Sequence, residues 1–172
     1  MDEPMMWVLI FSELAVFGLL LCAFAVAGAV SPTTFAAGRE VLDSGSAGLN
    51  TVVLVTSGWG AARGALASRE GRRRACRAWL TIAILLGGLF VAIKLFEYSG
   101  EIAAGVELET NTFFTLYFLL TGFHVLHVLL GMIILGTVLW SADVHAVETG
   151  TSFWHMVDLV WVTMFPVIYL AR

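Results

Sequence analysis

Long apolar stretches dominate the pattern of hydrophobic and polar positions along this chain. Five of them are close to or above the about 20 residues that an α-helix needs to cross the hydrocarbon core of a bilayer. They cover residues 5–30, 49–67, 79–99, 112–140 and 153–170. Short turn-forming segments separate them, such as Ser31-Pro32, where proline removes a backbone hydrogen-bond donor. The pattern predicts an all-α integral membrane protein, with five transmembrane helices in one domain of residues 1–172.

The composition agrees with this prediction. The 172 residues are 59% hydrophobic and only 13% charged, and the mean hydropathy is +0.91. A soluble domain normally carries about 25% charged residues. A core cannot enclose this much apolar surface, so we expect lipid to solvate most of the chain.

Charged residues between the apolar stretches predict the orientation of the helices. Five arginines lie between the second and third stretches: Arg69, Arg72, Arg73, Arg74 and Arg77. Such clusters stay on the cytoplasmic side of a membrane, whereas the next connection is acidic, with Glu101, Glu107 and Glu109. We therefore expect a cytoplasmic N-terminus and a periplasmic C-terminus. In a short juxtamembrane loop the arginines favour contact with anionic lipid, and we expect no nucleic-acid partner.

Ionisable side chains inside the apolar stretches need an explanation, because each costs at least about 2.5 kcal/mol at the bilayer centre. Glu13 is either a protonatable group that faces a partner or a water-filled path, or a neutral acid hydrogen-bonded to a neighbouring helix. Lys94 and Glu97 share one helix face because they are three residues apart. They form an interfacial ion pair, or Glu97 reaches across to the fourth stretch.

Three intramembrane histidines are candidates for hydrogen bonds between helices. His124 and His127 lie one turn apart in the fourth stretch, and His155 precedes Asp158 by one turn near the start of the fifth. A di-iron bundle would supply carboxylates in E-x-x-H pairs, and this sequence has none. We therefore predict no catalytic residue, metal ligand or cofactor-binding residue in this chain, and expect Asp158 to pair with His155 or a neighbouring helix.

Small residues in the second stretch predict a close helix contact. Gly60 and Gly64 form a G-x-x-x-G pattern, which lets two helix backbones approach in a membrane. We expect both glycines to line such a contact.

Five groups of residues carry a family resemblance. In chain order they are Ser12-Glu13, Leu49-Asn50-Thr51 with Ser57-Gly58, Glu97-Tyr98, T-G-F-H-x-x-H-V-x-x-G over residues 121–131, and W-H-x-V-D-x-V-W over residues 154–161. This order resembles subunit III of the haem-copper oxidases across nearly the whole chain. The five-helix length is similar to that of bacterial quinol oxidase subunits and of the NorE-type proteins associated with nitric oxide reductase. The sequence from Tyr117 to His127 looks most like that of the NorE branch.

The resemblance implies a non-catalytic accessory subunit in a bacterial inner membrane. The chain would stabilise the catalytic membrane subunit of a haem-copper oxidase superfamily complex, by this resemblance nitric oxide reductase. Haem and metal would lie only in that partner, and phospholipid would fill a V-shaped cleft. The resemblance also implies a proton or lipid role for Glu13, and tuning of proton or gas access.

Three alternatives stay open on the sequence. The chain could be subunit III of a terminal quinol or cytochrome c oxidase. It could instead be a stand-alone small transporter or channel, with its polar side chains lining a pathway. A small membrane haem enzyme using His124 or His127 is the third.

Overall fold

The computed structural model describes residues 3–141 and 143–170, and this part of the chain is all helical. The elements in chain order are α1 (Glu3–Val30), α2 (Pro32–Val41), α3 (Ser44–Arg69), α4 (Arg73–Ala103), α5 (Thr112–Ser141), α6 (Val144–Phe165) and a π-helical turn, η1 (Pro166–Leu170). Pro166 has no backbone N–H to donate, so the α-helical ladder ends there and the chain continues with wider turns. The all-α prediction is confirmed for the described residues.

Four helices in the described residues are long and apolar enough to cross a membrane, where the sequence led us to expect five. They cover Pro4–Val30, Arg73–Ala103, Thr112–Ser141 and Val144–Leu170. The helix α3, which contains the second expected stretch, is not among them. It is 26 residues long, but glycine, alanine, serine and threonine make up much of it and lower its hydropathy.

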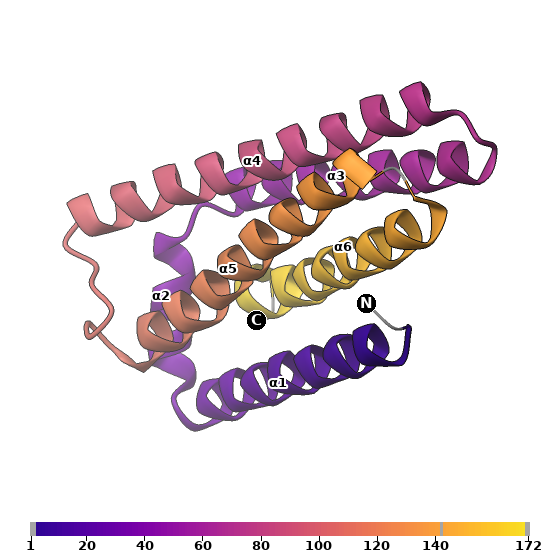
Figure 1. Ribbon diagram of the computed structural model, residues 1–172. Coiled ribbons are helices and arrows are strands. Elements are labelled where there is room, and N and C mark those ends of the chain that lie inside the picture. The colour runs from indigo at the N-terminus through magenta and orange to yellow at the C-terminus, as the bar shows by residue number, and fades with distance from the viewer. Residues whose placement is uncertain (1–2, 142, 171–172) are drawn as a thin grey trace.

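The long helices lie roughly alongside one another (Figure 1). The antiparallel pair α3 and α4 lies on one side, α5 and α6 lie next to it, and α1 lies on the far side of α6. The start of α1 meets Arg69 and the start of α6 at one end of the bundle, which we call the arginine end. The short helix α2 lies across the opposite end, beside the C-terminal turn (Figure 1).

The turn between α3 and α4 has a clear local cause. Gly71 adopts φ 71°, a left-handed conformation that favours glycine. The N–H of Gly71 donates to Ser68 O at 3.0 Å, and the N–H of Arg72 donates to Ala67 O at 2.9 Å. This pair of bonds is a Schellman motif, which satisfies the last carbonyls of α3 and reverses the chain.

Two helix starts differ from the sequence-based expectation. Ser31-Pro32 ends α1, but Pro32 also opens α2, because the first turn of a helix needs no N–H from that position. The helix α6 begins at Val144 rather than at residue 153, since Asp143 caps it by accepting from Ala146 N at 3.1 Å. His155 therefore lies near the middle of the Val144–Leu170 span rather than near its start.

A buried tryptophan joins four helices at the centre of the bundle. Trp154 of α6 is fully buried, and its indole N–H donates to Ser57 Oγ of α3 at 3.1 Å. A methyl group would lie 2.6 Å from the ring if added at Gly87 of α4, and 2.7 Å if added at Gly131 of α5. These two glycines leave room for the indole, so their lack of a side chain sets how closely α4, α5 and α6 pack.

The two glycines predicted to line a helix contact both face α4. A methyl group at Gly64 would lie 2.9 Å from Leu80 Cδ2, whereas one at Gly60 would lie 3.7 Å from Trp79 O. Only position 64 therefore lacks room for a larger residue.

Candidate functional site

A lysine is completely enclosed between α4, α5 and the C-terminal turn. Lys94 Nζ lies 2.9 Å from Tyr117 Oη, 2.6 Å from Tyr169 Oη and 3.2 Å from Glu97 Oε2. The side chain of Lys94 is 0% exposed, so two hydrogen bonds to the tyrosines and the ion pair with Glu97 replace its contacts with water. Lys94 and Glu97 do pair, but the pair is buried rather than interfacial, and Glu97 also reaches across to Tyr117 of α5.

The two carboxyl groups near this lysine both contact the hydroxyl of Tyr117. Glu97 Oε1 lies 2.8 Å from Tyr169 Oη and 3.0 Å from Tyr117 Oη. Glu101 Oε1 lies 2.9 Å from the same Tyr117 hydroxyl. We call these five residues, Lys94, Glu97, Glu101, Tyr117 and Tyr169, the lysine cluster.

Two members of the lysine cluster were not foreseen. The sequence predicts Glu101 to lie in an acidic connection, but α4 continues to Ala103 and buries it. The spacing of Lys94, Glu97 and Glu101, which fits one helix face, could have revealed this. Tyr169 lies 75 residues from Lys94 in the chain, and no local pattern connects them.

A second polar contact joins α1 to α5. Glu13 Oε2 lies 2.9 Å from His127 Nε2, and His127 Nδ1 lies 2.7 Å from Phe123 O. A carbonyl oxygen only accepts, so Nδ1 carries a proton and donates it there. One further proton lies in the Glu13–His127 contact, on either atom. The pair is neutral overall in both cases, which suits a membrane interior.

The neighbouring histidine is tied to a different helix. His124 is fully buried, and its Nε2 donates to Val157 O of α6 at 3.0 Å. Its ring also packs edge-on against Phe90 of α4, with the centroids 5.6 Å apart. His124 and His127 thus point to different neighbours, although they share one helix. Among residues 3–141 and 143–170, no three histidine, cysteine, aspartate or glutamate side chains form a group that could hold a metal ion.

His155 and Asp158 lie together at the contact of α6 with α3. His155 Nδ1 is 3.8 Å from Asp158 Oδ2, and the histidine side chain is 46% exposed. A methyl group added at Gly58 of α3 would lie 1.9 Å from Asp158 Oδ2, so the carboxyl group rests directly on the glycine backbone. Asp158 Oδ1 is buried without a hydrogen-bond partner among the described residues.

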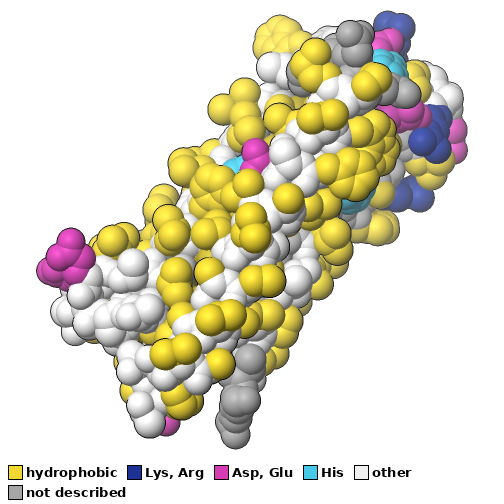
Figure 2. Space-filling model, turned by 90° about the horizontal axis from the view of Figure 1, so that it is seen from below, with side chains coloured by type: hydrophobic (Ala, Val, Ile, Leu, Met, Phe, Trp, Pro, Cys, Tyr) yellow, Lys and Arg dark blue, Asp and Glu magenta, His cyan; other side chains and the backbone are white. Residues whose placement is uncertain are grey.

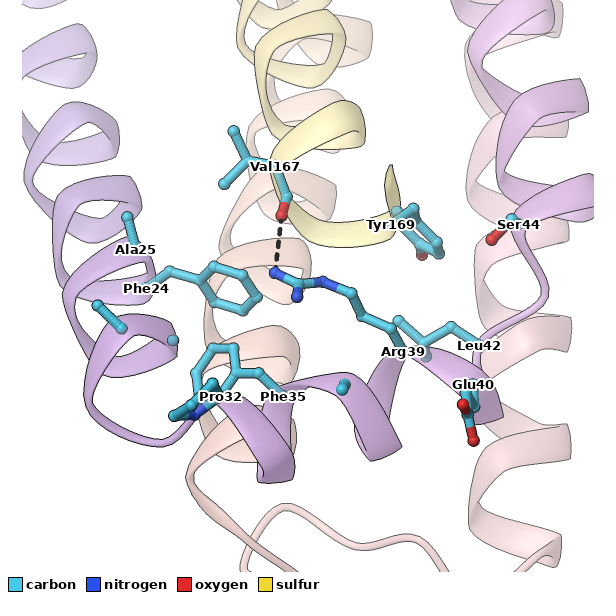
Figure 3. Close-up of a pocket in the computed structure, with 13 residues that line it drawn as sticks. Phe24, Ala25, Pro32, Phe35, Arg39, Glu40, Leu42, Ser44, Val167 and Tyr169 are labelled. Atoms are coloured by element: carbon cyan, nitrogen blue, oxygen red, sulfur yellow. Dashed lines mark hydrogen bonds between the residues drawn. The ribbon is translucent and has the colours of Figure 1, made fainter. Parts of the chain in front are cut away.

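A cavity of about 1060 Å³ opens at the end of the bundle opposite the arginines (Figure 3). It lies between α1, α2 and the C-terminal turn, and its lining includes Phe24, Ala25, Pro32, Phe35, Val167 and Tyr169. Arg39 of α2 reaches across it, and donates to Ile168 O at 3.0 Å and to Val167 O at 3.4 Å. These carbonyls lie in the last helical turn, where backbone acceptors lack intrahelical partners. Burial lowers the pKa of Arg39 from its usual value, but an arginine stays charged at physiological pH.

The surface separates apolar from charged side chains. Hydrophobic side chains cover much of the length of the face in Figure 2, and arginine side chains gather at one end. Large side chains such as Phe96, Leu19 and Trp140 are more than two-thirds exposed. Water would not tolerate so large an apolar surface, whereas lipid does.

Apolar walls, charged ends and internally paired polar groups define the chain as a multi-pass membrane protein, which in bacteria lies in the inner membrane. The family model described as cytochrome c oxidase subunit III matches residues 4–171. The chain belongs to that family, and this confirms the family resemblance noted in the sequence.

Individual members of the family also match nearly the whole chain. The chain is 31% identical to cytochrome c oxidase subunit 3 of Synechocystis sp., over 98% of the chain and 76% of the relative. It is 28% identical to cytochrome c oxidase subunit 3 of Thermostichus vulcanus, over 95% of the chain and 84% of the relative. It is also 27% identical to cytochrome bo(3) ubiquinol oxidase subunit 3 of Pseudomonas aeruginosa, over 95% of the chain and 82% of the relative. These names favour the terminal-oxidase alternative over the NorE branch, which the motif from Tyr117 to His127 had favoured.

Proposed function

We propose that the chain is the non-catalytic subunit III of a terminal oxidase of the haem-copper superfamily. The observation that carries the proposal is the family match over residues 4–171. The relatives named above are subunits of cytochrome c and ubiquinol oxidases. In this function the chain packs in the membrane against the catalytic subunit, which carries the haem and copper, and stabilises it.

The use of the histidine nitrogens supports a structural rather than a redox role for this chain. His127 engages both ring nitrogens, with Phe123 O and with Glu13. His124 engages Nε2 with Val157 O from within a fully buried position. Haem ligation by His127 would require one of its two hydrogen bonds to break, whereas His124 Nδ1, which has no hydrogen-bond partner among the described residues, lies in a fully buried side chain.

We also propose that α3 crosses the membrane as a fifth span, with the arginine end in the cytoplasm. The helix lies along α4, and Asn50 Nδ2 donates to Phe90 O at 3.2 Å while Ser57 Oγ donates to Ala83 O at 2.7 Å. These bonds let a helix of modest hydropathy satisfy its polar groups against a more apolar neighbour. The arginines at 69–77 favour the cytoplasm for this end.

Reporter fusions test this topology. Reporters placed after residues 43 and 71 should report opposite sides of the membrane, with the second in the cytoplasm. Reports from the same side would show that α3 does not cross, and a periplasmic report after residue 71 would reverse the orientation.

We further propose that phospholipid occupies the cavity at the opposite end. Its walls are mainly apolar, and Arg39 supplies one cation that suits a phosphate headgroup. Native mass spectrometry in mild detergent, with phosphatidylglycerol added, should detect bound lipid that Arg39→Gln weakens. Equal lipid retention by both proteins would contradict this assignment.

Purification of the complex tests the main proposal. An affinity tag on this chain, after mild detergent extraction, should recover a haem-copper oxidase catalytic subunit, identified by mass spectrometry. The recovered complex should show a haem absorption spectrum and consume oxygen. Recovery of a catalytic subunit that reduces nitric oxide but not oxygen would favour the NorE-type function instead. Substrate flux through liposomes that contain this chain alone would favour a transporter.

A further inference from the structure

The lysine cluster has more close contacts between polar atoms than it has N–H and O–H protons when both of its carboxyl groups are ionised. Lys94 Nζ donates to Tyr117 Oη and Tyr169 Oη, and it lies 3.2 Å from Glu97 Oε2 as an ion pair without a hydrogen bond to that oxygen. Tyr169 accepts one of these hydrogen bonds and donates its own proton to Glu97 Oε1 at 2.8 Å. The Tyr169 proton is therefore used by Glu97 and does not fill the 3.2 Å contact between the Tyr169 and Tyr117 hydroxyls.

The hydroxyl of Tyr117 then faces two acceptors with one proton. Glu97 Oε1 lies 3.0 Å from it and Glu101 Oε1 lies 2.9 Å from it. If both carboxylates were ionised, one of these contacts would bring two lone pairs together without a hydrogen. Glu101 Oε2 is also buried without a hydrogen-bond partner among the described residues, so an ionised Glu101 would be poorly solvated.

One added proton on Glu101 Oε1 gives each of the two contacts between Tyr117 and a carboxyl group its own hydrogen. The acid O–H then donates to Tyr117 Oη, and Tyr117 donates to Glu97 Oε1. Lys94 is positive, Glu97 is negative and Glu101 is neutral, so the cluster has no net charge. Neutrality matters here because an uncompensated charge in a membrane interior is costly.

We propose that the lysine cluster is a proton-binding site, in which Glu101 holds one exchangeable proton and Tyr117 links it to Glu97. Transfer moves the Glu101 proton to Tyr117 as the Tyr117 proton moves to Glu97. Tyr117 ends unchanged, Glu101 becomes a carboxylate and Glu97 becomes an acid. The negative charge moves by about one helical turn, roughly 6 Å along α4.

The geometry gives this site access to one side of the protein. Glu101 lies in the last turn of α4, next to the connection to α5. Tyr169 lines the open cavity at the same end of the bundle (Figure 3). The titratable or charged groups that face the site are Lys94, Glu97, Tyr98 and Glu101 of α4, Tyr117 and His124 of α5, and Tyr169 of the C-terminal turn. The proton therefore exchanges at the end of the bundle opposite the arginines.

Infrared spectroscopy of the full chain at neutral pH tests the proposal, because a neutral carboxylic acid absorbs apart from a carboxylate. The spectrum of Glu101→Gln should lack one neutral-acid band that the unchanged protein shows. The amide of glutamine donates to Tyr117 as the acid does, so we expect this variant to fold. Glu13→Gln is the matched control and should keep the Glu101 band. Equal neutral-acid absorption in the unchanged protein and in Glu101→Gln would overturn the proposal.

A second measurement does not depend on the folding of Glu101→Gln. Protein carrying Glu13→Gln and ¹³C-labelled glutamate should still show a neutral glutamic acid band, which shifts after transfer to heavy water. Exposed glutamates are ionised at neutral pH and do not contribute to this band. Absence of the band would show that Glu97 and Glu101 are both ionised. A band that does not shift in heavy water would show that the proton does not exchange, and either outcome would overturn the proposal. The experiment needs no catalytic subunit, so its result is separate from that of the complex purification.

Discussion

The lysine cluster and the Glu13–His127 pair differ in how far they are closed to the outside. Lys94 and Glu97 have side chains that are 0% and 6% exposed, and three separate elements enclose them. His127 and Glu13 are 9% and 25% exposed, and only α1 and α5 form their contact. Each has a carboxylate next to a nitrogen base. The closed cluster contacts only groups of this chain and leaves Glu97 Oε2 and Glu101 Oε2 without a hydrogen bond, whereas the open pair also presents Glu13 to lipid or to a neighbouring subunit.

Removal of one charge from the closed cluster should have the largest effect. Glu97→Gln removes the carboxylate that pairs directly with the buried Lys94 ammonium, which costs about 3–5 kcal/mol for buried pairs, less the part that Glu101 recovers by releasing its proton. We expect strongly reduced accumulation of the protein and easy unfolding in mixed detergent micelles. The double variant Lys94→Met/Glu97→Gln removes both charges and should recover most of the loss. An unaltered stability of Glu97→Gln would show that the cluster is not the closed site described here.

Removal of the shared hydroxyl should have an intermediate effect. Tyr117→Phe takes away the oxygen that Lys94, Glu97 and Glu101 all contact, and an unsatisfied buried group costs about 1–3 kcal/mol. Tyr98→Phe is the matched control, because Tyr98 Oη donates only to the neutral Thr121 Oγ1, at 2.6 Å. Unfolding in detergent should rank Tyr117→Phe as the less stable variant. The reverse order would mean that Tyr117 does not join the charges.

Changes to the open pair should have the smallest effect on stability. Glu13→Gln can still hydrogen-bond to His127, and couplings of this kind in membranes average about 0.6 kcal/mol. Assembly should persist, while the turnover of the catalytic partner should change if Glu13 exchanges protons with it. Unchanged turnover together with unchanged stability would remove any role for Glu13. A loss of stability as large as that of Glu97→Gln would remove the distinction between the two regions.

The two regions also differ in how far the sequence revealed them. Lys94 and Glu97 lie three positions apart, and helix geometry placed them together without any knowledge of the fold. Glu101 fits the same face, but its acidic neighbours in sequence made it resemble a loop residue. Glu13 and His127 were both singled out as intramembrane polar groups, yet their contact spans 114 positions and needed the packing of α1 against α5. No local sequence pattern predicted that Arg39 would hydrogen-bond to the C-terminal turn.

The apolar stretches by themselves determined that the chain is helical and embedded in a membrane, because a backbone in lipid must satisfy its hydrogen bonds within each helix. The ordered motifs also determined the family. Only the tertiary structure decided which polar groups meet, because a helix face has many possible neighbours and lipid does not choose among them. The tyrosines beside Lys94, the glycine under Asp158 and the partner of Glu13 all follow from close packing between helices that are distant in sequence.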